Sequence, residues 1–436
     1  MDLDLPIPPA PVRPVLTELR LPAYKSHRGT VLPLAPLTFL TGPSGSGKSA
    51  ALEAMAALAR LGAGAPLGEV FPDPASCVPE WAAAGGRQGR GFRIGCTVDG
   101  PAGPVRLDVA VRAEPELRLM GERLTADGRV LLTTALRDPR CRSVQAEWHT
   151  AGSARVTRAP LPDDRLGTAL LPLRVAGTTE GQRQVLAAAE QVLVALRSSF
   201  ACDPRPDRMR SPVAVVEGRL RGGCGNLAEV LRRTRGECGT RHAALVAASR
   251  TGCAGAVDDL AVEDLADGTV RAVLRRGAHT ATPVERLGDG ELRYLALALV
   301  LLTGPGVLDV DPVAEVLSAR QVLTVLADDF DRSLDRRQTA ELLALAARMT
   351  RRGHIRLLGA LREGTPVPGV DGANVAEGVD VAQGMDGAGG VDGAGRAGGP
   401  EGAGGARGAG GAGGADAVRV VHLADERDDP RGRDRP

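Results

Sequence analysis

The fold is decided by residues 37–49, LTFLTGPSGSGKS. Residues 37–41 form a compact apolar run that indicates a buried strand, and they lead straight into glycine-rich sequence. Residues 49–61, SAALEAMAALARL, carry apolar side chains at helical spacing and consist of good helix formers. Between the strand and the helix, residues 42–49 fit the pattern G-x-x-x-x-G-K-[ST]. This order of strand, loop and helix predicts a P-loop.

The predicted loop indicates binding of a nucleoside triphosphate, with ATP and Mg²⁺ as the expected ligands. Its glycines let the backbone turn tightly, so that successive N–H groups and the positive end of the helix dipole point toward phosphate oxygens. Lys25 and Lys48 are the only two lysines of the chain. Lys48 is expected to reach the β- and γ-phosphates, and the Ser49 hydroxyl is expected to bind Mg²⁺. A plain Gly/Ser turn is the alternative. The candidate nucleotide-binding residues are Gly42, Pro43, Ser44, Gly45, Ser46, Gly47, Lys48 and Ser49.

Two carboxylates, Asp328 and Asp329, directly follow the apolar residues 322–327. A carboxylate at the tip of a buried strand can hold Mg²⁺ beside a P-loop, so Asp328 is a candidate metal ligand together with Ser49. Asp329 is a candidate catalytic residue together with Lys48, because a neighbouring carboxylate can orient or deprotonate an attacking water. The alternative is an ordinary acidic end of a strand.

Residues 287–293, LGDGELR, precede and begin an apolar helix predicted for 290–302. A glycine-rich helix start is a candidate anion site, and Gly288 and Gly290 are candidate contacts to a nucleotide held by a second subunit. Taken alone, the segment favours a plain turn followed by a helix cap.

Composition excludes several classes of protein. The chain has 436 residues, 43% of them hydrophobic, and its net charge of +1 gives no support for DNA binding through a global field. The longest apolar run, residues 294–302, is too short to cross a bilayer, and the acidic, Pro-rich residues 1–14 are unlike a signal peptide. Seven scattered cysteines without a CxxC pair argue against zinc and for reduced thiols. We therefore expect a cytoplasmic protein without a membrane partner.

The pattern along the chain divides it into segments. Residues 92–134 alternate apolar and polar side chains and predict a small antiparallel sheet, whereas residues 366–416 are Gly/Ala-rich and predict a disordered internal loop. Further strands are predicted at 15–21 and 29–34, at the edge of a sheet, and at 270–274 and 355–358, with helices at 179–198, 226–234, 241–248 and 336–350. The predicted organisation is a flexible tail (1–14), an N-terminal half with the P-loop and the β-subdomain (15–165), a helical lobe (166–260), a C-terminal half (261–365), the loop (366–416), a last strand (417–424) and a tail (425–436).

In this order the motifs resemble the ABC-type ATPase heads of the RecF/SMC-like group, and among them the stand-alone, OLD-related bacterial AAA-type ATP-binding proteins. The resemblance covers residues 16–362, with 417–423 as a last strand. It implies an α/β P-loop NTPase fold, an ABC-ATPase-like head with an antiparallel β-subdomain and a helical lobe. The segments that carry it are residues 16–49, LRGGCGNLAEVL at 220–231, LGDGELRYLALALVLL at 287–302 and DDFDRSLD at 328–335.

The resemblance also implies roles for individual residues. In such heads two subunits sandwich ATP, with the P-loop of one facing the signature loop of the other, so the resemblance implies a homodimer joined through nucleotide. The matching positions are Gly42, Gly47, Lys48 and Ser49 for Walker A, Leu287–Glu291 for the signature loop, Asp328 for the Walker B aspartate, Asp329 for the catalytic glutamate and Leu334–Asp335 for the end of the D-loop.

Three departures from the family pattern concern hydrolysis. Asp329 is one methylene shorter than glutamate, Gly288 replaces the signature serine, and no switch histidine follows residues 355–358. Gln88 is the one candidate for the Q-loop glutamine. Since each lost polar group typically costs a factor of about 10²–10³ in rate, we expect ATP binding with slow, Mg-dependent hydrolysis coupled to head dimerisation. A non-hydrolysing, ATP-gated interaction module and a DNA-repair or phage-defence ATPase stay open as alternatives.

Two further features have two interpretations each. Tyr24 lies where such heads often contact adenine, although a core or surface tyrosine is favoured. The arginine-rich residues 205–210 and 232–241 can contact nucleic-acid phosphate, although a solvated helical face is favoured in a chain whose cations are nearly all arginine.

Overall fold

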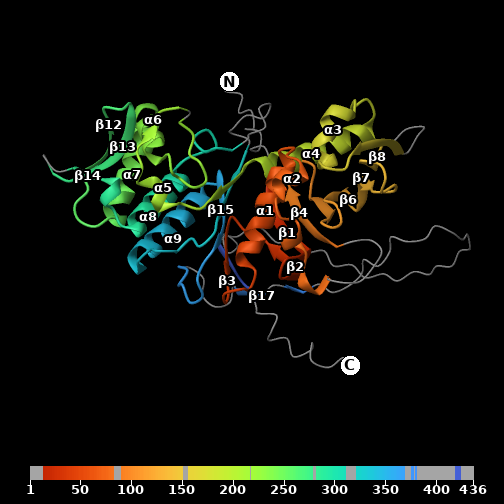
Figure 1. Ribbon diagram of the computed structural model, residues 1–436, viewed down its shortest axis with the longest axis horizontal. Coiled ribbons are helices and arrows are strands. Elements are labelled where there is room, and N and C mark those ends of the chain that lie inside the picture. The colour runs from red at the N-terminus through yellow and green to blue at the C-terminus, as the bar shows by residue number, and fades with distance from the viewer. Residues whose placement is uncertain are drawn as a thin grey trace, which may run out of the picture.

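A six-stranded parallel sheet forms the centre of the protein (Figure 1). In this computed structural model the structure is described for residues 13–82, 90–150, 156–216, 218–277, 281–310, 321–368, 375–377, 379–380 and 418–423. Every strand pair in the central sheet is parallel, so all its strands end at the same edge. Across the sheet the order is β10 (Ser199–Cys202), β15 (Leu323–Ala327), β16 (Ile355–Ala360), β3 (Leu37–Thr41), β19 (Val418–His422) and β17 (Val375–Glu377).

The second sheet has nine strands, antiparallel throughout, and it lies in the right-hand half of Figure 1. Its hairpins follow from alternating sequence: in VRLDVAVR, the side chains of Val105, Leu107 and Val109 are buried and those between them are more exposed. The order is β18 (Val379–Asp380), β2 (His27–Pro33), β1 (Val15–Tyr24), β4 (Gly91–Asp99), β5 (Val105–Arg112), β6 (Arg118–Ala126), β7 (Arg129–Ala135), β8 (Ser143–His149) and β9 (Val156–Pro162).

Helices and a small third sheet complete the described fold. The helices are α1 (Lys48–Gly62), α2 (Leu67–Val70), α3 (Gly167–Arg174), α4 (Glu180–Arg197), α5 (Pro206–Met209), α6 (Leu227–Glu237), α7 (Gly239–Gly252), α8 (Asp289–Leu302) and α9 (Arg336–Arg351), with 3-10 turns η1 (Ala75–Cys77), η2 (Glu80–Ala82) and η3 (Val284–Arg286). The third sheet contains β11 (Val213–Ala214), β13 (Thr269–Arg275), β12 (Asp259–Asp264) and β14 (Ala281–Pro283).

The central sheet separates two hydrophobic cores. Leu326 and Leu358 face the core that contains α1, α4 and the antiparallel sheet. Their neighbours Val325 and Leu357 point the other way, into the core that contains α6 to α9. This alternation is the period of two expected for a strand that is buried on both faces. The P-loop helix α1 and the helix α8 therefore cover opposite faces of the sheet.

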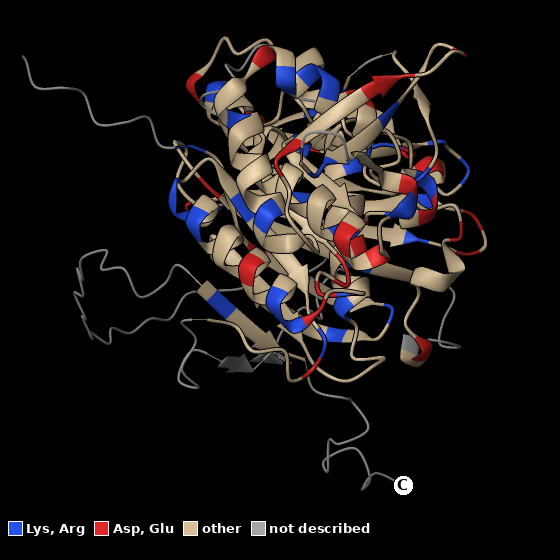
Figure 2. Cartoon of the chain, turned by 90° about the vertical axis from the view of Figure 1, so that its left-hand side faces the viewer, with Lys and Arg blue, Asp and Glu red and all other residues tan. Residues whose placement is uncertain are grey.

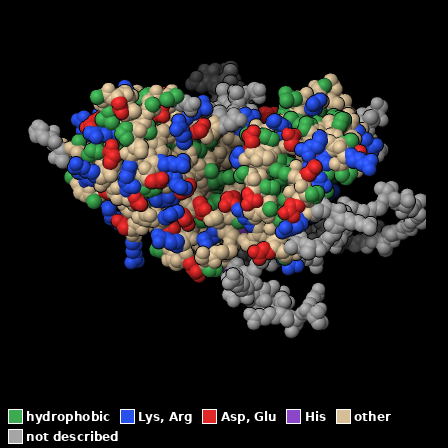
Figure 3. Space-filling view, viewed as in Figure 1, with side chains coloured by type: hydrophobic (Ala, Val, Ile, Leu, Met, Phe, Trp, Pro, Cys, Tyr) green, Lys and Arg blue, Asp and Glu red, His purple; other side chains and the backbone are tan. Residues whose placement is uncertain are grey.

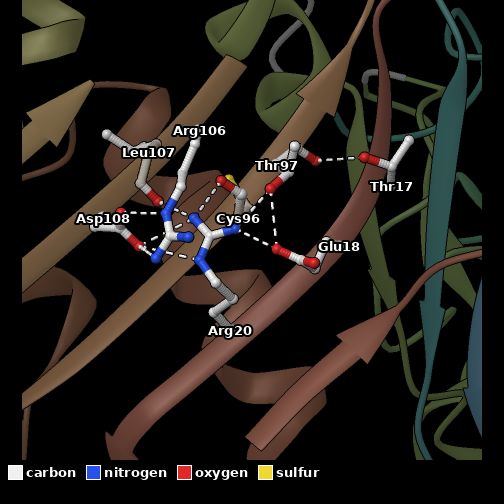
Figure 4. Close-up of polar contacts among 8 residues, drawn as sticks. All are labelled: Thr17, Glu18, Arg20, Cys96, Thr97, Arg106, Leu107 and Asp108. Carbon is white, nitrogen blue, oxygen red and sulfur yellow. Dashed lines mark hydrogen bonds and ion pairs between the residues drawn. The ribbon is translucent and has the colours of Figure 1, made fainter. Parts of the chain in front are cut away.

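A buried arginine joins three strands of the antiparallel sheet (Figure 4). The guanidinium of Arg20 on β1 donates to the carbonyl oxygens of Cys96 on β4 (2.8 Å) and Leu107 on β5 (3.0 Å), and to the Asp108 carboxylate (3.1 Å). Gly95 makes room for it, because a Cβ there would lie 2.6 Å from the Leu107 carbonyl oxygen. Strand β1 pairs with β2 on one side and with β4 on the other, so it lies inside the sheet. The prediction that it lies at an edge is therefore wrong.

Most predicted elements are confirmed, with small shifts at their ends. These are the strands at β3, β13, β15, β16 and β19, the β4–β5 hairpin and its continuation through β6 and β7, and the helices α1, α4, α6, α7, α8 and α9. The strands β8, β9, β10, β11, β12 and β14 were not predicted, and β17 and β18 fall within residues 366–416, where a disordered loop was expected. Residues 381–416 lie outside the described part of the chain.

Residues 166–260, predicted as one helical lobe, are shared between the two sides of the central sheet. Helix α4 packs with α1 in the first core, and Gln191 ties it to the β4–β5 turn by donating to the carbonyl oxygens of Val98 (3.0 Å) and Gly103 (2.7 Å). Residues 199–202 then cross the protein as strand β10 beside β15, and only the elements after them join the second core. A strand of four residues is too short for periodicity to reveal.

Candidate functional site

The P-loop lies between β3 and α1, where the backbone makes two conformations that favour glycine. Gly42 has φ +138° and Gly47 has φ +92°. A Cβ on Gly42 would lie 2.3 Å from the carbonyl oxygen of Leu423, directly after β19, and one on Gly47 would lie 2.6 Å from Nε2 of His27. Both glycines of the sequence pattern are therefore required by their backbone angles and by close neighbours.

The polar groups of the loop have the character of a phosphate site. Nζ of Lys48 donates to the carbonyl oxygens of Gly42 (2.7 Å) and Pro43 (2.8 Å), so the ammonium is folded over the loop itself. Oγ of Ser46 is buried and has no hydrogen-bond partner among the described residues, while Ser49 is exposed at the start of α1. The first-turn amides of a helix have no intrahelical acceptor, so the amides at the start of α1 are further donors at this site. These groups fit a polyphosphate that accepts bonds from Lys48, Ser46 and the amides.

His27 is a neighbour of the P-loop that the sequence analysis missed. It is 4% exposed, its Nε2 lies 3.0 Å from the Gly47 carbonyl oxygen, and its Nδ1 lies 3.2 Å from the Thr30 hydroxyl. Because a carbonyl only accepts, the neutral ring carries its proton on Nε2 and donates to Gly47. Burial lowers the pKa of His27, and the bond to Gly47 offsets part of that effect. His27 is the first residue of β2, and a histidine at the start of a strand carries no local signal for this contact.

The lowered pKa of His27 predicts a pH-dependent stability. The folded protein binds this proton less readily than the unfolded chain does, so the contribution of His27 is complete above the ordinary pKa of 6.5 and decreases as the pH falls below it. We expect His27→Gln, which keeps a donor for Gly47, to reduce the slope of unfolding free energy between pH 5 and 6.5 by at most about 1.4 kcal/mol per pH unit. Urea titrations of both proteins measure this. The pKa of His354 is also lowered by burial, but both proteins contain His354, so its effect on the slope cancels in the comparison. Equal slopes in the two proteins would contradict the prediction.

Asp328 and Asp329 lie at the end of β15, at the same sheet edge as the P-loop. One strand, β16, separates β15 from β3, so the two strand tips are about 10 Å apart. Oδ1 of Asp328 accepts a hydrogen bond from the amide of Asp329 (3.0 Å), and the Asp329 side chain is 53% exposed. Asp329 has φ +45°, which turns the chain sharply after the strand. The topology places both carboxylates at the edge of the sheet where β3 leads into the P-loop.

The turn after β15 is held from the side of β16. Asp331, which is 2% exposed, accepts hydrogen bonds from the Arg362 guanidinium (3.3 Å) and the Thr365 hydroxyl (2.6 Å). Its own carbonyl oxygen accepts a further bond from Arg362 (2.7 Å). Arg362 belongs to the segment where a switch histidine was absent from the sequence. In this chain the segment after β16 therefore fastens the turn that follows Asp329.

The candidate signature residues lie on the other side of the central sheet. Gly288 precedes α8, and its amide donates to the Glu291 carboxylate (3.1 Å). A Cβ on Gly290 would lie 2.4 Å from the carbonyl oxygen of Ser333, so a glycine is needed where the signature segment meets the predicted D-loop. Arg210 donates to Asp289 (2.6 Å). The fold does not bring Gly288 and Gly290 to the P-loop of the same chain, because α8 and α1 cover opposite faces.

The remaining sequence candidates have less to do with the site. Tyr24 is 2% exposed and packs edge-to-face on Phe92, so it is a core residue and the adenine-contact interpretation is wrong. Gln88 lies outside the described residues. The arginines at 205–210 and 232–241 are largely paired with carboxylates, and Figures 2 and 3 show Lys and Arg interspersed with Asp and Glu on the faces they display. These pairs are Arg205–Asp203, Arg210–Asp289, Arg232–Asp264, Arg233–Glu237 and Arg235–Asp259.

The fold is a mixed α/β fold in which a parallel central sheet, an antiparallel sheet and helices surround a P-loop sequence between β3 and α1. The sequence matches no protein-family model, and it matches no curated protein. Similar solved structures include the SMC head domain from Thermotoga maritima (13% identity, TM-score 0.38, 80% of this chain and 90% of that chain). An Smc head bound to the C-winged helix domain of ScpA is 13% identical with a TM-score of 0.46, over 80% of this chain and 91% of that chain.

A third similar structure is an Smc head with an extended coiled coil bound to the C-terminal domain of ScpA, derived from Pyrococcus furiosus. It is 10% identical, with a TM-score of 0.43 over 81% of this chain and 90% of that chain. Among the described helices, none is both long and apolar enough to span a membrane.

Proposed function

We propose that this protein binds Mg-ATP at the P-loop and hydrolyses it slowly, in step with nucleotide-dependent pairing of two heads. The observation that carries the proposal is the P-loop itself, with glycines at positive φ, Lys48 folded over the loop and a buried Ser46 hydroxyl without a partner among the described residues. A triphosphate would supply an acceptor for the Ser46 hydroxyl and stronger, charged acceptors for the Lys48 ammonium. The carboxylates at the end of β15 lie at the same sheet edge, as hydrolysis requires.

In the proposed mechanism each side chain has one task. Lys48 moves its donors from the carbonyl oxygens of Gly42 and Pro43 to the β- and γ-phosphates. Ser49 and Asp328 would hold Mg²⁺, which would neutralise phosphate charge when bound. Asp329 orients the attacking water and accepts its proton.

Pairing of two heads would complete the site. Gly288 and Gly290 lie away from the P-loop of their own chain, at the amino end of α8. We propose that they contact nucleotide on the P-loop of a second copy, where the backbone amides at the start of α8 face the γ-phosphate. Without a serine hydroxyl at position 288, this contact relies on the amides alone.

A non-hydrolysing, ATP-gated interaction module is the second candidate function. It is favoured by one specific observation, the short side chain of Asp329, which is half exposed and lies 3.8 Å from Arg332. The DNA-processing alternative, which came from the resemblance, has no comparable support, because most of the arginines at 205–210 and 232–241 are paired with carboxylates.

The test of the proposed function combines binding and turnover on the full chain. Calorimetry with Mg-ATP measures binding, sedimentation with and without nucleotide measures head pairing, and phosphate release over hours measures hydrolysis. Binding with pairing and slow phosphate release supports the first candidate function. Binding with pairing and no phosphate release supports the interaction module, and an absence of binding refutes both.

Lengthening the carboxylate at position 329 is expected to speed hydrolysis. Asp329→Glu adds one methylene, which brings the carboxylate nearer to a water in line with the γ-phosphate, and we expect phosphate release to rise about tenfold. Asp329→Asn, which cannot accept a proton, should lower release below the wild-type rate. Both variants should bind Mg-ATP within about threefold of wild type, because a residue acting on water in the transition state contributes little to ground-state affinity. Equal rates for all three proteins would show that Asp329 does not act on water.

A further inference from the structure

Arg293 is a buried charge beside the candidate catalytic turn, and no role was assigned to it from the sequence. It lies on α8, five residues after Gly288, and is 3% exposed. Its only ion-pair partner among the described residues is Asp203, which is 47% exposed and accepts from Nη1 at 3.2 Å. Burying an arginine costs free energy unless its donors are hydrogen-bonded, so the groups that accept from Arg293 indicate what it does.

The guanidinium of Arg293 joins three segments of the chain. Nη1 donates to the carbonyl oxygen of Pro204 (2.7 Å), just after strand β10, as well as to Asp203. Nη2 donates to the carbonyl oxygen of Asp329 (2.9 Å), just after strand β15. Since Arg293 itself is part of α8, one planar group fixes the helix that carries the candidate signature loop to the residue proposed to orient water.

The bond to Asp329 acts where the backbone conformation is unusual. Asp329 has φ +45°, a region that L-residues seldom occupy, and its carbonyl oxygen also accepts from the amide of Arg332 (2.9 Å). The direction of the Asp329 side chain depends on this backbone angle. The two donors that hold the carbonyl therefore fix the direction in which the Asp329 side chain leaves the backbone, and one of them comes from a different element of the fold.

The amino end of α8 is fastened near the same place. Arg210 donates to the carbonyl oxygen of Leu287 (2.9 Å) and to Asp289 (2.6 Å), which couples the candidate signature loop to the segment that follows β10. A displacement of α8 by about 1 Å would stretch the bond from Arg293 to Asp329 beyond hydrogen-bonding distance. The position of α8 and the conformation of Asp329 are thus linked by direct bonds.

We infer that Arg293 is a positioning residue: it holds Asp329 in the orientation needed for hydrolysis, and only while α8 keeps its place. This inference rests on the proposed function. It assigns Arg293 no contact with nucleotide, since its hydrogen bonds go to Asp203, Pro204 and Asp329. It predicts that losing Arg293 affects turnover far more than binding.

The test compares Arg293→Met with wild type in two measurements. Met retains much of the volume and removes all donors. We expect Mg-ATP affinity within about threefold of wild type and a phosphate-release rate lower by about 10²-fold, the effect typical of a misplacement near 1 Å. In nucleotide-free protein, amide hydrogen exchange over residues 328–333 should accelerate, while exchange over residues 42–49 stays unchanged.

Three control variants separate positioning from general support of the fold. Arg293→Lys keeps a charge that can reach Asp203 or Asp329 but not both, so turnover should fall between wild type and Arg293→Met. Asp203→Asn removes the ion pair and leaves the bond to Asp329, so turnover should stay within about threefold of wild type. Arg356→Met removes a half-buried arginine that donates to the Leu34 carbonyl oxygen (2.9 Å) near the amino end of β16, and turnover should not change.

Specific outcomes overturn the inference. Wild-type turnover in Arg293→Met, with unchanged exchange over 328–333, refutes it. So does a loss of binding in step with turnover, or an equal loss in Arg356→Met, since both indicate a general structural role. A wild-type protein that binds Mg-ATP but never releases phosphate refutes the hydrolytic part of the proposed function instead, and the exchange measurement then decides alone whether Arg293 holds the turn.

Discussion

Replacing Lys48 with methionine should weaken Mg-ATP binding by at least about 10²-fold and reduce phosphate release to background. The ammonium is the only formal positive charge within the P-loop sequence, and charge-assisted bonds to phosphate are about twice as strong as neutral ones. In the wild type, Nζ of Lys48 donates to the carbonyl oxygens of Gly42 and Pro43. In the variant these oxygens lose that donor and repel phosphate oxygens. Calorimetry and a phosphate-release assay measure the two effects.

The matched control for Lys48→Met is Arg183→Met. Arg183 lies on α4 with 57% of its side chain exposed and pairs with Glu180, so this change also removes one positive charge but lies outside the proposed site. We expect its binding and turnover to equal those of wild type. Lysine acylation read by mass spectrometry adds a direct measurement, because the chain has only Lys25 and Lys48 to resolve and Mg-ATP should protect Lys48. Unchanged turnover in Lys48→Met would place the ATPase activity elsewhere or in a contaminant.

The largest expected effect on stability comes from Arg118 on β6. Its guanidinium donates to Asp163 and to the carbonyl oxygens of Pro139 and Cys141, and the Arg118 and Asp163 side chains are only 1% and 3% exposed. Arg118→Met removes the ion pair's positive partner and leaves a carboxylate buried. Breaking such a pair typically costs about 3–5 kcal/mol, and urea titration of the free energy of unfolding measures it.

Two further variants show whether the buried charge is the cause. Arg142 lies 3.8 Å from the same Asp163 carboxylate but is 64% exposed, so Arg142→Met should cost less than about 1 kcal/mol. The double variant Arg118→Met with Asp163→Leu removes both charges and should recover much of the stability, because an apolar pair needs no compensation. A double variant as unstable as Arg118→Met alone would instead indicate that the bonds to the 139–141 loop dominate.

The candidate site was readable from sequence where its chemistry is local. Residues 42–49 form a loop whose backbone angles are set by their own glycines. The strand before it is an unbroken apolar run, and the helix after it is long enough to show its periodicity. Asp328 and Asp329 were also found, because they follow an apolar run that ends at a sheet edge. His27 and Arg293 were not found, since each contacts residues distant along the chain and neither stands in a pattern that points to a ligand.

The same division explains the fold. Local sequence by itself determined the P-loop, the identity of the long helices, the alternating hairpin strands and the return of residues 418–422 as a strand, since hydrophobic period and turn residues act within a few positions. Only the tertiary structure decided that the four residues of β10 join the central sheet beside β15, and that β1 is an inner strand. It also decided that a single arginine on α8 meets Asp329. These outcomes depend on which surfaces remain to be paired once the cores are formed, and that information is spread over the whole chain.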